Sequence, residues 1–101
     1  MKRVKVPAKL YNGALRFCND ILKAKGRKAI KKLPAGRGGD PKSCPCSKAC
    51  GAFVESDEFR FDTSMPKRFT SPSPEVLIQF VEFFDAEANQ EVAMPVRGLR
   101  S

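Results

Sequence analysis

The sequence contains no histidine. Histidine is the side chain whose unperturbed pKa lies closest to neutrality, so its absence excludes histidine-dependent catalytic triads and metal sites that mix cysteine with histidine. Long apolar runs are also missing, because the run at residues 76–78 has only three residues, against the roughly 18 that cross a bilayer. A chain of 101 residues can build a small core, but not a core and a large substrate cleft together. We therefore expect one small binding domain that is not an enzyme and needs no cofactor.

Export signals are missing as well. Residues 1–7 include lysine and arginine, but they are not followed by the roughly 7 to 15 apolar residues of a signal peptide. We expect a cytoplasmic protein without a membrane partner. In a reducing compartment its four cysteines are expected as free thiols or metal ligands rather than as disulfides.

Charge is divided unevenly along the chain. Residues 1–43 carry 13 Lys/Arg and 2 Asp, a net charge of +11, whereas residues 44–101 carry 6 Lys/Arg and 9 Asp/Glu, a net charge of −3. The two segments together account for the formal net charge of +8. A strongly cationic segment raises the local concentration of polyanions or acidic proteins before any specific contact forms.

Apolar residues recur at three- and four-residue intervals between residues 8 and 25, which predicts a helix. Gly26 can end this helix in a left-handed conformation. Gly13 lies inside the pattern at a cost of about 1 kcal/mol relative to alanine. An alternative start therefore lies nearer Asn12, which could act as an N-cap.

The residues that follow alternate between short helices and a loop. Residues 27–33 repeat the helical spacing and predict a second, short helix. Residues 34–41 are rich in glycine and proline and predict a loop. The glycines at 36–39 lack the preceding strand and the Lys-Ser/Thr pair of a nucleotide-binding loop, although a contact with another phosphate remains open. Proline at position 45 predicts the start of a short helix over residues 45–50 that closes on Gly51.

The second half of the chain predicts a hairpin and an apolar helix. Alternating residues predict strands at 52–55 and 58–63, joined by a turn at 56–57. A two-stranded hairpin is marginal alone and must lie on a helix. The most apolar segment, residues 74–85, predicts that helix, with Ser73 as its N-cap.

Together these elements predict an α+β fold in which three or four helices pack around a short β-hairpin. We expect residues 1–7 as a basic arm or a short strand. Residues 8–86 are expected as the single domain, and residues 87–101 as a flexible C-terminal tail.

The four cysteines allow several interpretations. Cys44, Cys46 and Cys50 form a C-x-C-x3-C pattern, and Cys18 is a candidate fourth ligand for an all-cysteine zinc site. The spacing is not that of the usual C-x2-C pairs, and cysteine is among the most often buried residue types. We favour packing in the core, with zinc, a regulatory disulfide or an iron–sulfur cluster as alternatives.

A dense group of cations gives the clearest functional indication. Seven lie within fifteen residues with no acidic residue between them: Lys23, Lys25, Arg27, Lys28, Lys31, Lys32 and Arg37. Such a run is usually a solvated surface, but it can also form an electrostatic footprint on phosphates. No aromatic residue is interleaved with these cations, which argues against a stacking platform for single strands.

The sequence Leu-Pro-Ala-Gly-Arg-Gly-Gly-Asp-Pro-Lys-Ser-Cys-Pro at residues 33–45, followed by Ser-Lys-Ala-Cys-Gly at residues 47–51, resembles a pattern in small proteins of actinobacteria and their phages. A later Phe-Val-x-x-Phe-Asp of that pattern is echoed at residues 80–85. The resemblance covers about half the chain and brings no activity with it. The family pattern has aliphatic residues where this chain has Cys46 and Cys50, which implies that these two thiols fill the core. It further implies an accessory protein of an actinobacterium or its phage.

Two functions follow from these features. The first is nucleic-acid binding through the basic N-terminal helices, as a small regulator or accessory factor. The alternative is a protein-interaction module, for instance a phage-encoded protein that binds an acidic host protein.

Overall fold

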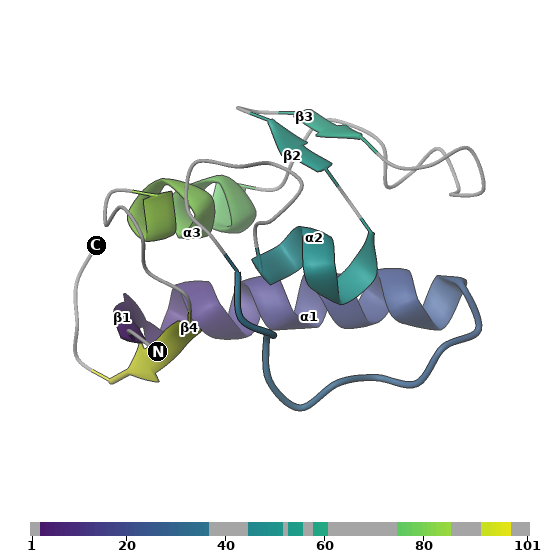
Figure 1. Ribbon diagram of the computed structural model, residues 1–101, viewed down its shortest axis with the longest axis horizontal. Helices are drawn as coiled ribbons and strands as arrows, with labels where there is room; N and C mark the ends of the chain where they lie inside the picture. The colour runs from purple at the N-terminus through teal and green to yellow at the C-terminus, as the bar shows by residue number, and fades with distance from the viewer. Residues whose placement is uncertain are drawn as a thin grey trace.

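The computed structural model describes residues 3–36, 45–51, 53–55, 58–60, 75–85 and 92–97. These residues form three helices and two pairs of strands (Figure 1). In chain order the elements are β1 (Arg3–Pro7), α1 (Ala8–Ala24), α2 (Pro45–Cys50), β2 (Phe53–Glu55), β3 (Glu58–Arg60), α3 (Glu75–Asp85) and β4 (Val92–Val96). The radius of gyration is 12.4 Å, close to the value of about 13 Å typical of a compact domain of 100 residues. The protein is therefore a small single domain of mixed α and β structure.

A parallel pair of strands joins the two ends of the chain. In β1 and β4, Arg3 lies opposite Val92 and Pro7 lies opposite Val96. Val4 and Val6 are buried on one face of β1, whereas Arg3 and Lys5 are exposed. Of the basic arm and the short strand considered for residues 1–7, the structure shows a strand over residues 3–7. Residues 92–96 lie in the segment expected as a flexible tail, and the structure corrects that expectation because they form β4.

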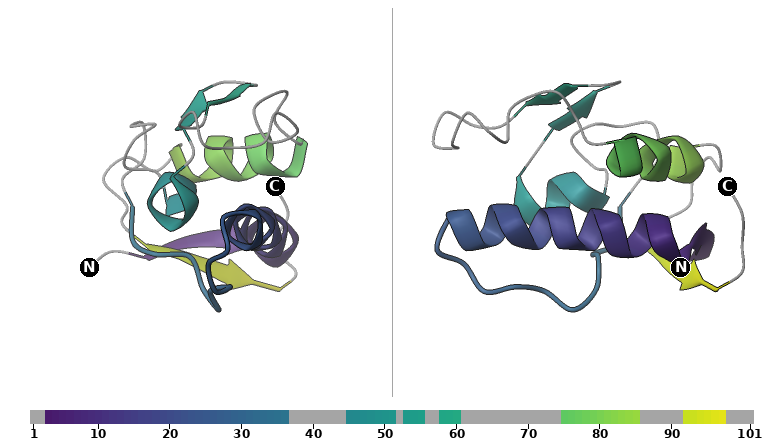
Figure 2. Two further views of the ribbon diagram at one scale, coloured as in Figure 1. Left: turned by 90° about the vertical axis from the view of Figure 1, so that its right-hand side faces the viewer. Right: turned by 180° about the vertical axis from the view of Figure 1, so that it is seen from behind.

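Helix α1 is the central element. On one side it contacts α2 and α3, and β4 lies on its other side (Figure 2). It runs straight through Gly13, so the alternative start near Asn12 is wrong. A Cβ atom at Gly13 would lie 2.5 Å from Cγ2 of Val76 on α3. Glycine is needed there because it lets α3 approach α1 closely.

The end of α1 matches its prediction. Gly26 has a φ of 74°, and its N–H donates to the carbonyl of Lys23 at 3.0 Å, while the N–H of Arg27 donates to the carbonyl of Leu22 at 2.8 Å. These two bonds form a Schellman motif, in which a left-handed glycine satisfies the last carbonyls of a helix.

The short helix predicted over residues 27–33 is not formed. The segment instead runs back along α1, below the helix in Figure 1, where α2 lies above it. Side chains of α1 bind its backbone at Ile30 and Leu33. Because backbone groups bound to side chains cannot also form a helical ladder, these bonds favour an extended course.

Helix α2 follows its predicted range, ends at Cys50 and is followed by Gly51, whose φ is 80°. The predicted hairpin is present within the described residues, where β2 and β3 are antiparallel and Val54 lies opposite Phe59. The helices do not pack around this hairpin, however. The sheet that contacts α1 and α3 is the parallel pair of β1 and β4, and the hairpin lies beyond α2 (Figure 1).

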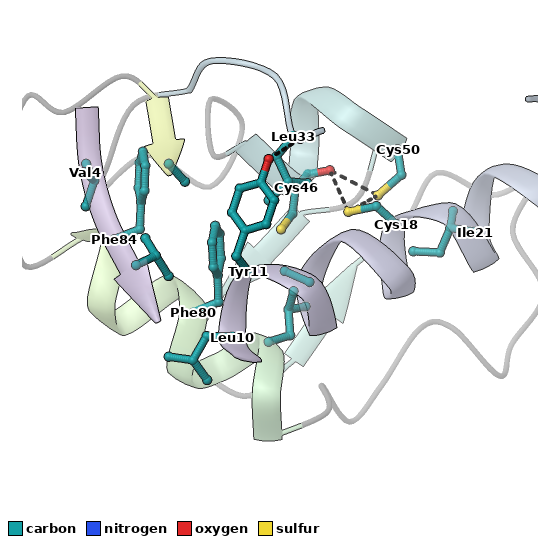
Figure 3. Packing of buried hydrophobic residues seen from close by; sticks show 14 of the residues in the cluster. Val4, Leu10, Tyr11, Cys18, Ile21, Leu33, Cys46, Cys50, Phe80 and Phe84 are labelled. Carbon is teal, nitrogen blue, oxygen red and sulfur yellow. Dashed lines mark hydrogen bonds between the residues drawn. The ribbon is translucent and has the colours of Figure 1, made fainter. Parts of the chain in front are cut away.

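The core is formed where α1, α3 and the parallel strands meet (Figure 3). Leu77, Phe80 and Phe84 of α3 are fully buried, and the rings of the two phenylalanines stack with centroids 6.0 Å apart. Burying each such side chain contributes about 1.5–3 kcal/mol. The predicted cap of this helix at Ser73 lies outside the described residues. None of the helices described is both long and apolar enough to span a membrane.

Candidate functional site

The segment 27–36 is fastened to α1 by two side chains. The amide of Asn19 donates through Nδ2 to the carbonyl of Ile30 at 3.0 Å, and its Oδ1 accepts from the N–H of the same residue at 2.8 Å. Two turns earlier on α1, the buried hydroxyl of Tyr11 accepts from the N–H of Leu33 at 2.9 Å (Figure 3). The segment is therefore held at two points, and its course is fixed without regular secondary structure.

This fastened segment carries most of the cations singled out in the sequence. Of the seven cations singled out in the sequence, those that the structure shows as exposed are Lys23 at the end of α1 and four residues of the segment: Arg27, Lys28, Lys31 and Lys32. None of them forms an ion pair with a carboxylate among the residues that the structure describes. The predicted site residue Arg37 lies outside the described residues.

Lys25 is used differently from its neighbours. It is half-buried, and its Nζ donates to the carbonyl of Cys50 at the end of α2, at 3.0 Å. A lysine at this position satisfies a terminal carbonyl and complements the negative end of the helix dipole. This bond gives Lys25 a structural role, which is to join α1 to α2. The sequence had assigned Lys25 to a phosphate-binding surface and did not indicate that role.

One further cation belongs to the same side of α1. Arg16, Asn19 and Lys23 are three and four residues apart, which places them on one ridge of the helix. Asn19 binds the segment 27–36, and Arg16, one turn earlier on the same ridge, is exposed. The spacing of polar residues along α1 places Arg16 on the same ridge as Asn19. The sequence alone, however, does not show that the segment 27–36 binds to that ridge.

We call this group the cationic surface: Arg16, Lys23, Arg27, Lys28, Lys31 and Lys32. Its electrostatic setting is one-sided, since residues 3–36 contain ten Lys/Arg and a single acidic residue, Asp20. Cations that pair with no carboxylate among the described residues favour a positive potential that extends into solvent. Such a surface attracts polyanions.

A second group lies on the α2 side of α1 and consists of thiols (Figure 3). Cys18, Cys46 and Cys50 are all buried and free of disulfides. The Sγ of Cys50 lies 3.8 Å from the Sγ of Cys18 and donates to the carbonyl of Cys46 at 3.0 Å. We call these three residues the thiol cluster. Cys44, the remaining member of the predicted zinc set, lies outside the described residues.

Hydrogen bonding sets the acidity of the thiol cluster. Bonds with the side chains of Cys46 and Cys50 lower the pKa of Cys18 from its ordinary value of 9.0 to about 5, although burial acts in the opposite direction. Within the described ranges, no three metal-ligating side chains are arranged to hold a metal ion. The cluster thus joins α1 to α2 by packing and weak sulfur hydrogen bonds.

No protein family, curated protein or solved structure matches this chain. The described residues offer two candidate functional features, the cationic surface and the thiol cluster.

Proposed function

We propose that the protein is a small, non-enzymatic accessory factor that binds nucleic acid through the cationic surface. The observation that supports this most strongly is the fastening of the segment 27–36 by Asn19 and Tyr11. A mobile lysine-rich loop would lose conformational entropy on binding, whereas a segment already held against α1 loses less. The bonds thus present the cations in a fixed arrangement.

Phosphates are the chemistry that this arrangement fits. Each phosphate that a lysine or arginine neutralises releases condensed counterions, and this release favours binding without regard to base sequence. The one tyrosine near the cationic surface is buried and bonded to Leu33, so it offers no ring for base stacking. We therefore propose contacts to the sugar–phosphate backbone of a duplex, which carries a higher charge density than a single strand.

Fluorescence anisotropy with a labelled DNA duplex tests this function. The first variant replaces three exposed lysines of the segment: Lys28→Gln, Lys31→Gln and Lys32→Gln. Because three phosphate contacts are lost, we expect affinity at about 50 mM salt to fall on the order of tenfold or more.

A matched variant changes the net charge by the same amount on other elements. It carries Lys5→Gln, Lys48→Gln and Arg97→Gln, all at exposed positions of β1, α2 and the residue after β4. We expect this variant to lose much less affinity than the first. Equal losses in the two variants would show that net charge alone drives binding, and that outcome would contradict the proposed surface.

A further inference from the structure

Cys18 on α1 and Cys50 on α2 are two thiols in contact inside the protein, which is the arrangement needed to form a disulfide. Their Sγ atoms are 3.8 Å apart, and a disulfide bond is about 2.05 Å long. The two sulfurs must therefore approach by less than 2 Å. Helix α2 has only six residues, and so short a helix is held by its tertiary contacts rather than by its own ladder. A small shift of α2 toward α1 would close the gap.

We propose that Cys18 and Cys50 form a reversible disulfide when the protein meets a peroxide, and that this bond joins α1 covalently to α2. The inference is independent of the proposed nucleic-acid function. It rests on the contact between the two sulfurs, on the short length of α2 and on the third thiol beside them.

The chemistry balances with hydrogen peroxide as the oxidant. The thiolate of Cys18 attacks one peroxide oxygen, the O–O bond breaks, and a sulfenic acid and hydroxide are formed. The sulfur of Cys50 then loses its proton and attacks the sulfenic sulfur, which releases water. Overall, two thiols lose two electrons and two protons, and one peroxide is reduced to two waters. A thiol reductant reverses the reaction by exchange.

The surroundings assign different roles to the two sulfurs. The lowered pKa of Cys18 favours its thiolate, the form that attacks peroxide. Cys18 is fully buried and only 4% of Cys50 is exposed. Reaction therefore proceeds through local opening of α2, and we expect it to be slow compared with an exposed thiol.

The bond would enclose the segment that carries four of the six residues of the cationic surface. Cys18 and Cys50 are 32 positions apart, and residues 27–36 lie between them. A cross-link that closes a loop of this length restricts the unfolded chain. We expect oxidation to raise the midpoint of thermal unfolding by on the order of 10 °C.

Peptide mapping of the full chain tests the pairing directly. Reduced protein is treated with hydrogen peroxide, alkylated, digested with trypsin and analysed by mass spectrometry. Trypsin separates the candidates, because Cys18 falls in peptide 17–23, Cys44 and Cys46 in peptide 43–48, and Cys50 in peptide 49–60. We expect peptides 17–23 and 49–60 to be linked, and the link to disappear with dithiothreitol.

Other results would overturn the proposal. They are a dominant link that involves peptide 43–48, oxidation of single cysteines to sulfinic or sulfonic acid without any link, or no reaction at all. Zinc bound at one ion per chain in the purified protein would also overturn it, because the thiols would then be metal ligands.

Two variants of neighbouring cysteines on α2 complete the test. Cys50→Ala should abolish the link. Cys46→Ala keeps both sulfurs and should retain the link, but the link should form more slowly, because the side chain of Cys46 helps to lower the pKa of Cys18. Circular dichroism establishes whether each variant is folded. If Cys50→Ala does not fold, the peptide map of the unmodified sequence and its thermal shift still decide the pairing.

Discussion

The two sides of α1 are held by different forces. Toward α3, the contact consists of apolar side chains, with Gly13 letting the helices come close. Toward the segment 27–36, the burial of Leu33 in the core is joined by hydrogen bonds between the backbone of the segment and the side chains of Asn19 and Tyr11. The apolar contact between α1 and α3 provides most of the buried core and so determines the fold. The polar side leaves the cations of the segment facing solvent, and it is where we place function.

The largest expected effect breaks the apolar side. Phe80→Ala removes a fully buried ring that stacks on Phe84. We expect the free energy of unfolding to fall by about 3–5 kcal/mol, because both transfer energy and a cavity are lost. Urea denaturation measures this change. The exposed Glu82 on the same helix provides the control, since Glu82→Ala should change stability by less than about 0.5 kcal/mol.

A smaller effect is expected on the polar side. Asn19→Ala removes both bonds to Ile30, and we expect a loss of about 1–3 kcal/mol together with weaker binding to duplex DNA. Asn12→Ala is a matched control, because Asn12 is exposed on the same helix and should change neither property. Loss of stability without loss of DNA affinity would show that the fastening is structural and does not organise the cationic surface.

The thiol cluster predicts a pH effect whose sign follows from Cys18. Its pKa is about 5 in the folded protein and 9.0 ordinarily, so between these values the unfolded chain binds more protons than the folded one. The stabilisation is complete above pH 9 and is lost as the pH falls toward 5. We expect the free energy of unfolding, measured in reductant, to rise with pH across this window. The rise should be smaller in Cys18→Ala, and an unchanged slope would contradict the shift.

How much of this structure could be predicted from the sequence differs between the same two sides. The course of α1, its end at Gly26 and the short α2 follow from local patterns, and all were predicted. The hairpin was predicted for the same reason, since alternation and a turn lie within a few residues.

The failures share a physical cause, which is that the deciding contacts join distant residues. Ile30 and Leu33 have helical spacing. Their backbone N–H groups, however, donate hydrogen bonds to the side chains of Asn19 and Tyr11 on α1. Likewise β4 has a short apolar run interrupted by Pro95 and becomes a strand only because β1, at the other end of the chain, pairs with it. Periodicity within a window does not contain such partners.

The sequence predicted most of the residues that form the candidate site, but it did not predict how those residues are arranged. The cations of the cationic surface were evident from their density, apart from Arg16, which needed the position of the segment beside α1. Lys25 was assigned to the same surface, and its bond to Cys50 depends on α2 lying against α1. A charge count cannot distinguish a lysine that caps a helix from one that faces solvent.

The salt dependence of duplex binding tests the central claim most directly. If the cationic surface makes six phosphate contacts, the logarithm of the association constant should fall with the logarithm of salt concentration at a slope of about −5. Replacing Lys28, Lys31 and Lys32 by glutamine should reduce the magnitude of the slope by about 3. A slope near zero, or one that the three replacements leave unchanged, would contradict phosphate binding by this surface.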